Sequence, residues 1–347
     1  MAPPLSVLDL SPVPAGSDAA QALRNTVDLA RHAERLGYLR YWVAEHHNTP
    51  GLASAAPEVM IGQVAAATSR IRVGAGGIML PNHSPLRVAE TFRVLEALHP
   101  GRIDLGLGRA PGTDGVTAVA LRRTRGPGAE DFPALLEELL AYAGDGLPEG
   151  HPFASVRAEP VDVPLPPIWM LGSSEYGARV AAALGVGFAF ARHLNPRGAA
   201  EVMRLYRRSF SPTPVMPEPR AILAVSAICA DRAERADELS WSLALSVVRM
   251  RSGRPAKLPP PEEAMAYDYS PGESDQVRRY RRAQVLGDPG EVHAELTRLV
   301  EETEADELMV MSTVYDHAER RRSYELLAEA FGLRRPAGVG SAPRPAT

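Results

Sequence analysis

Short apolar runs alternate with longer amphipathic segments along the chain. Eight of the runs are predicted strands, because they are short, apolar and bounded by turn residues. They are residues 5–10, 41–45, 71–79, 102–107, 168–171, 187–191, 221–230 and 307–312. Most are continuously apolar, as is typical of parallel strands covered on both faces. Eight parallel strands joined by helices predict an α/β fold, the TIM (β/α)8 barrel.

The segments between these runs are predicted helices. The first begins after Asp18, a suitable N-cap, and stops at Gly37. Another begins after Asp288, and the last ends at Gly332. We expect residues 1–335 to form one barrel domain. The tail, residues 336–347, is rich in Pro, Gly, Ala and Ser and is expected to be disordered.

Two connections between predicted strands are much longer than the others. One covers residues 110–166, after the fourth strand, and the other covers about residues 251–287, after the seventh. In a (β/α)8 barrel both would leave the C-terminal ends of strands, where active sites lie. We therefore predict two insertions that act as lids or pocket walls. The alternative is that they are loops without a function.

Composition excludes several classes of partner. The 347 residues carry 38 Lys and Arg against 42 Asp and Glu, a net charge of −4, with no long basic block. This pattern argues against binding to nucleic acid or to an anionic membrane. No stretch approaches the roughly 20 apolar residues of a membrane span, and the N-terminus lacks the features of a signal peptide. A cytoplasmic location is expected.

Several kinds of chemistry are also disfavoured. The single cysteine, Cys229, excludes disulfides within the chain, and the single lysine, Lys257, lies in a proline-rich loop unsuited to a Schiff base. A Gly-x-Gly-x-x-Gly dinucleotide motif is not supported, because Pro111 stands where the third glycine would follow Gly106 and Gly108. No metal site is predicted, because the scattered histidines show no ligand spacing: His83, His151, His193, His293 and His317.

Polar and glycine-rich groups follow the predicted strands. His46 and His47 come after the second strand, where an imidazole is a candidate acid or base, although they are also compatible with an ordinary loop. Gly76 and Gly77 interrupt the third strand, which indicates either a barrel corner or a place where a flat ligand approaches the backbone.

A candidate phosphate site spans the next two strands. Arg109 follows the fourth strand, and Ser173 and Ser174 follow the fifth, directly before a predicted helix. A guanidinium and the N–H groups of a helix N-terminus both suit a phosphate. The serines are equally compatible with ordinary helix capping. Because the two strands are adjacent, their ends together favour a phosphate site.

Taken together, these motifs resemble those of the bacterial luciferase-like flavin-dependent monooxygenases. The resemblance covers about residues 5–335. The matching segments are residues 41–47 (YWVAEHH), 73–90 (VGAGGIMLPNHSPLRVAE), 100–112 (PGRIDLGLGRAPG), 171–174 (LGSS) and 306–312 (DELMVMS). Each segment is only moderately specific, and the order and spacing of all five carry the resemblance.

The resemblance implies a barrel that binds reduced FMN at its mouth. His46 matches the family's catalytic histidine. The residues implied in cofactor binding are Glu45, Gly76, Gly77, Arg109, Ser173, Ser174 and Tyr176. Of these, the glycines match a strand bulge, often a non-proline cis peptide, that supports the flavin ring. The arginine, the serines and the tyrosine match the phosphate site.

The implied activity is an FMNH2-dependent monooxygenation. O2 would react through a flavin C4a-peroxide to hydroxylate, epoxidise or Baeyer–Villiger-oxidise a small organic substrate, such as a polyketide or another secondary metabolite. A separate flavin reductase would supply FMNH2, and the chain would form a homodimer. Gly172 replaces the acidic residue of luciferase itself, which argues against light emission and favours the subgroup that includes antibiotic-pathway oxygenases.

Three alternatives remain open on the sequence. The wider family includes F420-dependent oxidoreductases, which transfer hydride without using oxygen. A flavin-binding protein without catalysis is the second alternative, and the match of His46 to the catalytic position argues against it. The third is a barrel that binds no flavin.

Overall fold

The computed structural model describes residues 3–122, 131–144 and 146–333. At its centre eight parallel strands close into a barrel, because the last of them pairs with both β8 and β1. In barrel order the strands are β1 (Leu5–Asp9), β2 (Arg40–Val43), β3 (Arg72–Ala75), β5 (Ile103–Gly108), β6 (Ile168–Gly172), β7 (Gly187–Ala191), β8 (Ala221–Cys229) and β10 (Glu307–Met311). The predicted TIM barrel is confirmed.

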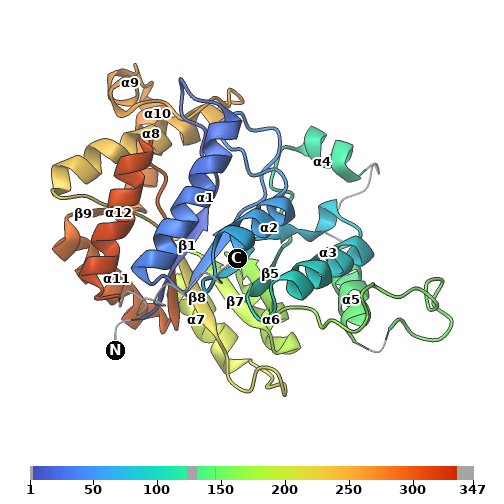
Figure 1. Ribbon diagram of the computed structural model, residues 1–347. Helices are drawn as coiled ribbons and strands as arrows, with labels where there is room; N and C mark the ends of the chain where they lie inside the picture. The colour runs from blue at the N-terminus through green and yellow to red at the C-terminus, as the bar shows by residue number, and fades with distance from the viewer. Residues whose placement is uncertain (1–2, 123–130, 145, 334–347) are drawn as a thin grey trace, which may run out of the picture.

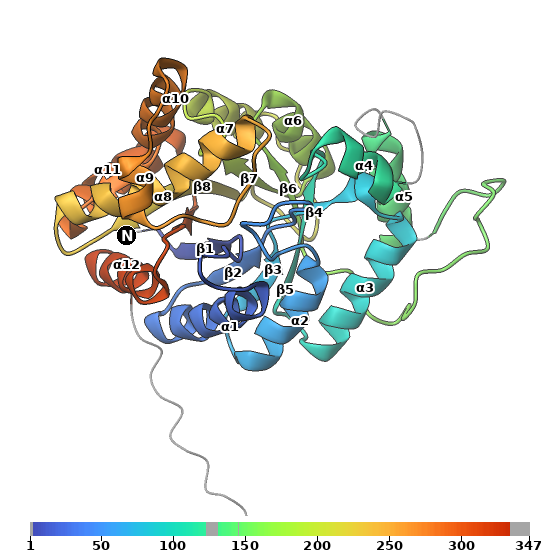
Figure 2. The same ribbon diagram turned by 90° about the horizontal axis from the view of Figure 1, so that it is seen from above.

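Helices surround the strands (Figures 1 and 2). Those that cover the barrel are α1 (Ala19–Leu36), α2 (Pro57–Ala67), α3 (Pro85–Leu98), α6 (Glu175–Leu184), α7 (Ala199–Arg208), α11 (Pro289–Thr303) and α12 (His317–Ala330). The predicted ends of α1 are confirmed, because the Asp18 side chain accepts a hydrogen bond from the Gln21 N–H and Gly37 adopts a φ of 91°. Asp288 caps α11 as predicted, whereas α12 ends at Ala330, just before Gly332.

The predicted third strand, 71–79, is divided in the structure. β3 pairs with β2 and β5, whereas β4 (Ile78–Met79) pairs with β5 alone, and a cis peptide joins Gly76 to Gly77 between them. A Cβ at Gly76 would lie 2.6 Å from Leu8 Cδ1, and one at Gly77 would lie 2.8 Å from the Gly106 oxygen. A side chain at Gly77 is therefore excluded by backbone, whereas one at Gly76 would require the Leu8 side chain to move. Both glycines line the cavity at the barrel mouth.

The two long connections contain helices of their own. The first holds α4 (Gly115–Arg122) and α5 (Phe132–Ala143). The second follows the long helix α8 (Ala233–Arg251) and holds α9 (Pro261–Ala266), α10 (Pro271–Arg282) and a short strand, β9 (Val285–Gly287), that was not predicted and pairs with β8. Backbone hydrogen bonds tie Leu258 to Val13 and Ala15, in the loop after β1. The predicted disordered tail, 336–347, lies outside the described residues.

The two ends of the barrel differ in chemistry. Near the N-terminal ends of the strands, Asp104 accepts hydrogen bonds from Arg40, Arg72 and the Trp42 indole, and Arg40 also pairs with Glu307. Closer to the mouth the barrel interior is largely apolar. This inner cluster consists of Leu8, Trp42, Ala44, Trp169, Ala189, Ile222, Ala224, Met309 and Met311. The ion pairs therefore plug one end of the barrel and leave the other for a ligand.

Candidate functional site

A cavity of about 490 Å³ lies at the C-terminal ends of the barrel strands. Residues of β1, β2, β5, β6, β7, β8 and β10 contribute to its wall, together with α8 and the segment that follows α8. The C-terminal face is where (β/α)8 enzymes place their active sites. We therefore take this cavity as the candidate active site.

The structure brings seven of the eight predicted site residues together in this cavity. They are His46, Gly76, Gly77, Arg109, Ser173, Ser174 and Tyr176. They come from the ends of β2, β5 and β6, from the break between β3 and β4, and from the first turn of α6. Side chains more than 60 residues apart in the chain thus line one space.

Glu45, the eighth predicted residue, does not line the cavity. It is fully buried and accepts hydrogen bonds from His47 Nε2 (2.8 Å), His83 Nε2 (3.0 Å) and the backbone N–H of Met79 (2.8 Å). Burial alone would raise its pKa, but these hydrogen bonds and the charge of His83 outweigh burial and lower the pKa to about 2. Glu45 therefore holds the end of β2 against β4, behind the wall on which a cofactor would lie.

His46 faces a different environment from its neighbour His47. Its ring lines the cavity, and its Nδ1 is buried without a hydrogen-bond partner among the described residues. Burial lowers the pKa of His46, while the charge of Glu45 acts in the opposite direction. His46 is thus a neutral imidazole near pH 7, able to accept or donate a proton.

The predicted phosphate site has a defined geometry. The Arg109 guanidinium lies over the Tyr176 ring, 4.2 Å from its centroid, so the side chain is held at the start of α6. Ser174 is the N-cap of α6 by position, but its side chain makes no capping hydrogen bond. Its hydroxyl and the first N–H groups of α6 are therefore available to an anion.

Two features of the cavity were missed in the sequence. His193 lies just after β7 and lines the cavity, but from the sequence it was assessed only as a metal ligand. Its position directly after a predicted strand was the available signal. The second feature is one face of α8 that lines the cavity with side chains three and four residues apart: Leu243, Ser246, Val247, Met250 and Arg251.

The segment after α8 completes the wall. Pro255, Ala256, Leu258 and Tyr280 line the cavity, so the prediction that residues 251–287 form a pocket wall is confirmed. The Tyr280 hydroxyl lies close to Ser226, and burial raises the pKa of Tyr280. Most of this wall is apolar, which limits the access of water to the cavity.

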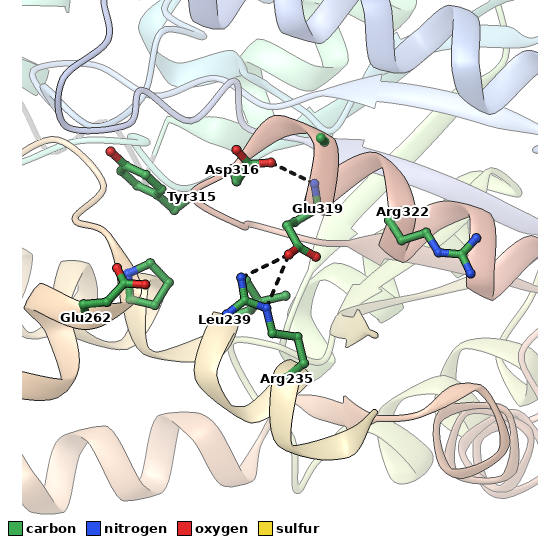
Figure 3. Close-up of a pocket in the computed structure, with 9 residues that line it drawn as sticks. Arg235, Leu239, Glu262, Tyr315, Asp316, Glu319 and Arg322 are labelled. Carbon is green, nitrogen blue, oxygen red and sulfur yellow. Dashed lines mark hydrogen bonds and ion pairs between the residues drawn. The ribbon is translucent and has the colours of Figure 1, made fainter. Parts of the chain in front are cut away.

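A second cavity of about 580 Å³ lies on the surface among α8, α9 and α12 (Figure 3). Its charged side chains are engaged with one another, since Arg235 pairs with Glu319 and Asp316 caps the first turn of α12. It contains none of the predicted site residues.

Membrane-spanning helices and clusters of metal ligands are both absent from the described ranges. No helix in residues 3–122, 131–144 and 146–333 is long and apolar enough to cross a membrane. Within the same ranges, no group of three or more His, Cys, Asp or Glu side chains is arranged to hold a metal ion.

The barrel and the cavity at its C-terminal face define an enzyme of the (β/α)8 class, and sequence comparison identifies the family. Residues 4–341 match the model of the luciferase-like monooxygenases, so the chain belongs to this family of oxidoreductases. It is 50% identical over 330 residues to the uncharacterized protein YvbT of Bacillus subtilis (strain 168), covering 94% of this chain and 96% of the relative.

Two further relatives have names that describe an activity. The luciferase-like monooxygenase of Escherichia coli (strain K12) is 44% identical over 321 residues, covering 92% of this chain and 95% of the relative. The N-acetyl-S-alkylcysteine monooxygenase of Bacillus subtilis (strain 168) is 37% identical over 327 residues, covering 94% and 97%. These relatives match the chain over nearly its whole length.

Solved structures share the fold. Apo-MsnO8 superposes with a TM-score of 0.86 at 38% identity, covering 96% of this chain and all of that chain. More distant structures include the oxygenating constituent of 3,6-diketocamphane monooxygenase from Pseudomonas putida in complex with FMN (TM-score 0.69, 18% identity; 95% and 98% covered). An F420-dependent secondary alcohol dehydrogenase has a TM-score of 0.70 at 15% identity, covering 96% and 100%.

Proposed function

We propose that this enzyme is an FMNH2-dependent monooxygenase that uses O2 to oxygenate a small organic substrate. The observation that carries the proposal is the convergence, in one cavity, of a possible phosphate site, a flat glycine surface and a neutral imidazole. Reduced FMN would supply the electrons that activate O2, and the protein would supply binding, orientation and exclusion of water.

The residues of the cavity fit FMN at two places. Arg109, with the Ser174 hydroxyl and the N-terminus of α6, would bind the phosphate. Gly76 and Gly77 carry no side chains, and at Gly77 the neighbouring backbone leaves no room for one, so this segment would offer a flat surface to the isoalloxazine ring. Glu45 keeps this surface in position through its hydrogen bond to the Met79 N–H.

His46 would act on protons at the reacting end of the cavity. Its ring lies in the cavity at the end of β2, its pKa is lowered by burial, and no described residue occupies its Nδ1. The apolar face of α8 and the loop from Pro255 to Leu258 would keep the reaction away from water.

The substrate proposal starts from a relative. Because the N-acetyl-S-alkylcysteine monooxygenase shares 37% identity with this chain, thioethers are the first substrate class to test. The largely apolar wall of the cavity, which includes Leu243, Val247 and Met311, fits an alkyl chain. Hydroxylation, epoxidation and Baeyer–Villiger oxidation are the other outcomes that product analysis would distinguish.

Anaerobic titration distinguishes FMN from F420. The enzyme is titrated with FMNH2 and with reduced F420, and air containing ¹⁸O2 is then admitted with N-acetyl-S-butylcysteine or other small organic compounds. We expect binding of FMNH2 and a product that carries one ¹⁸O atom. Tight binding of F420 alone, without oxygen consumption, would assign the protein to hydride transfer instead.

The proposal includes two partners and a location. A separate flavin reductase would supply FMNH2, since the sequence has no dinucleotide-binding motif. We further propose a cytoplasmic homodimer formed through the outer faces of α2 and α3, which expose Val59, Val94 and Leu98.

A further inference from the structure

Four histidines near the barrel mouth fall into two pairs. His47 and His83 both place Nε2 within hydrogen-bond distance of Glu45, at 2.8 and 3.0 Å. Their role is therefore to hold the loop that follows β2. His46 and His193 make no such contact with Glu45, and both line the cavity.

The positions of His46 and His193 place them on opposite walls. His46 follows β2 and His193 follows β7, and these strands lie four places apart in either direction around the closed eight-stranded barrel. Burial lowers the pKa of His193 to about 4, a hydrogen bond to the Ala224 backbone acts in the opposite direction, and charge on His46 lowers the pKa a little further. Both imidazoles therefore reach inward from opposite sides of the same space.

Both rings have unused hydrogen-bonding capacity. Nδ1 of His46 and Nδ1 of His193 are buried, and neither has a partner in the described part of the chain. A neutral imidazole offers one N–H donor and one acceptor lone pair. The His193 ring donates to the Ala224 backbone carbonyl, so its Nδ1 is left as an acceptor. Buried polar atoms are normally satisfied, so an unpartnered pair in a ligand cavity indicates that a ligand completes it.

The charges around the cavity indicate what kind of group that is. No Asp or Glu is among the described residues that line it, so a cationic group would find no counter-ion. The two cations of the wall are Arg109, which lies over Tyr176, and Arg251, which is exposed at the end of α8. Neither charge is part of the imidazole pair. The pair therefore suits an uncharged group that can donate a hydrogen bond to His193 Nδ1.

We propose that His193 is a substrate-binding residue and that, opposite His46, its Nδ1 accepts a hydrogen bond from an uncharged amide or hydroxyl group of the substrate. The remainder of the substrate lies along the apolar face of α8. This inference rests on the proposed function, because it assumes that FMN occupies the Arg109 side of the cavity. It adds a residue and a substrate feature that the family assignment does not provide.

The test compares three probes with one alkyl chain and different head groups. Binding of hexanamide, hexanoate and hexylammonium to the FMN-loaded protein is measured by calorimetry at pH 7.5. We expect hexanamide to bind most tightly. His193→Leu should weaken hexanamide binding about five- to tenfold, the size of one neutral hydrogen bond, and leave FMN affinity unchanged. His193→Gln keeps a polar group and should recover part of the loss.

The control is His151→Leu, a histidine of the loop before β6 that does not line the cavity, and it should bind hexanamide as the wild type does. Tighter binding of hexanoate or hexylammonium by the wild type would overturn the proposal. So would unchanged hexanamide affinity in His193→Leu, or a loss of FMN affinity in that variant, which would make His193 a cofactor contact. If the wild type does not bind FMN at all, the proposed function fails first and separately.

Discussion

Arg109 carries the cofactor assignment at the scale of single residues. Removing its guanidinium takes away charge-assisted hydrogen bonds worth about 1.5–3 kcal/mol each, so Arg109→Ala should weaken FMN binding about 10- to 100-fold. Quenching of FMN fluorescence measures the dissociation constant. Arg179→Ala is the matched control, because Arg179 lies on α6, the helix whose N-terminus belongs to the proposed phosphate site, and pairs with Glu175 away from the cavity. Equal FMN affinity in Arg109→Ala and wild type would refute the phosphate site.

His46 carries the proposed proton chemistry. His46→Ala should lower oxygenation by about 10²–10⁴-fold, the usual contribution of a general acid or base. FMN binding should remain close to that of wild type, since the phosphate and ring surfaces are contributed by other residues. Measuring turnover and FMN affinity on the same preparation separates these two effects. Unchanged turnover would remove His46 from the mechanism.

Glu45 predicts how stability depends on pH. Its pKa falls from 4.5 to about 2 on folding, so the unfolded chain binds more protons between these values. The stabilisation is complete above pH 4.5 and is lost as the pH falls towards 2, by about 3 kcal/mol in total. Urea unfolding at pH 6, 4 and 3 should show a shallower pH dependence in Glu45→Gln than in wild type. Glu201→Gln, on an exposed position of α7, should retain the wild-type slope.

At this scale the sequence predicted positions better than roles. Most of the candidates were found because polar groups at strand ends converge in a parallel barrel. The role of Glu45 was not predictable, because its hydrogen bonds come from His83 and Met79, more than 30 residues away. His193 was missed for a similar reason, since its unpartnered Nδ1 becomes visible only when the opposite wall is in place.

At the scale of elements, the break between β3 and β4 offers a direct test. In Gly77→Ala the new Cβ would lie 2.8 Å from the Gly106 oxygen, which is backbone and cannot move away easily. We expect a loss of about 1–3 kcal/mol of stability, together with weaker FMN binding. The control is Gly115→Ala, where nothing lies within 4 Å of the added Cβ. Thermal unfolding and FMN titration provide the readouts, and wild-type values for Gly77→Ala would contradict this account.

The barrel strands were predicted from the sequence, whereas the break in the third strand and the short strand β9 were not. All eight barrel strands were predicted, because continuous apolar runs of that length leave few alternatives. The division of residues 71–79 depends on the close approach of Leu8 and Gly106, which local sequence does not encode. β9 has three residues and is defined only by its pairing with β8, so it is too short to be predicted from sequence periodicity.

At the scale of the whole molecule, an exposed apolar surface on α2 and α3 remains that the barrel fold does not explain. Val59, Val94 and Leu98 are 59%, 47% and 67% exposed, and they lie on α2 and α3, which run side by side (Figure 1). Apolar side chains gathered on the surface of two adjacent helices favour an interface with another chain. The C2 homodimer is the commonest symmetric assembly, and it would bury this face against its own copy.

The dimer can be tested without reference to activity. Val94→Arg combined with Val59→Arg places two charges in the proposed interface, and burying unpaired charge is strongly unfavourable. Light scattering should show a dimer for wild type and a monomer for this variant at the same concentration. Val215→Arg is the control for placing an arginine at an exposed valine outside the proposed interface. Val215 is 87% exposed in the loop between α7 and β8. A dimer that survives the double substitution, or one disrupted by Val215→Arg, would place the interface elsewhere. FMN titration of the monomeric variant then shows whether one chain alone binds the cofactor.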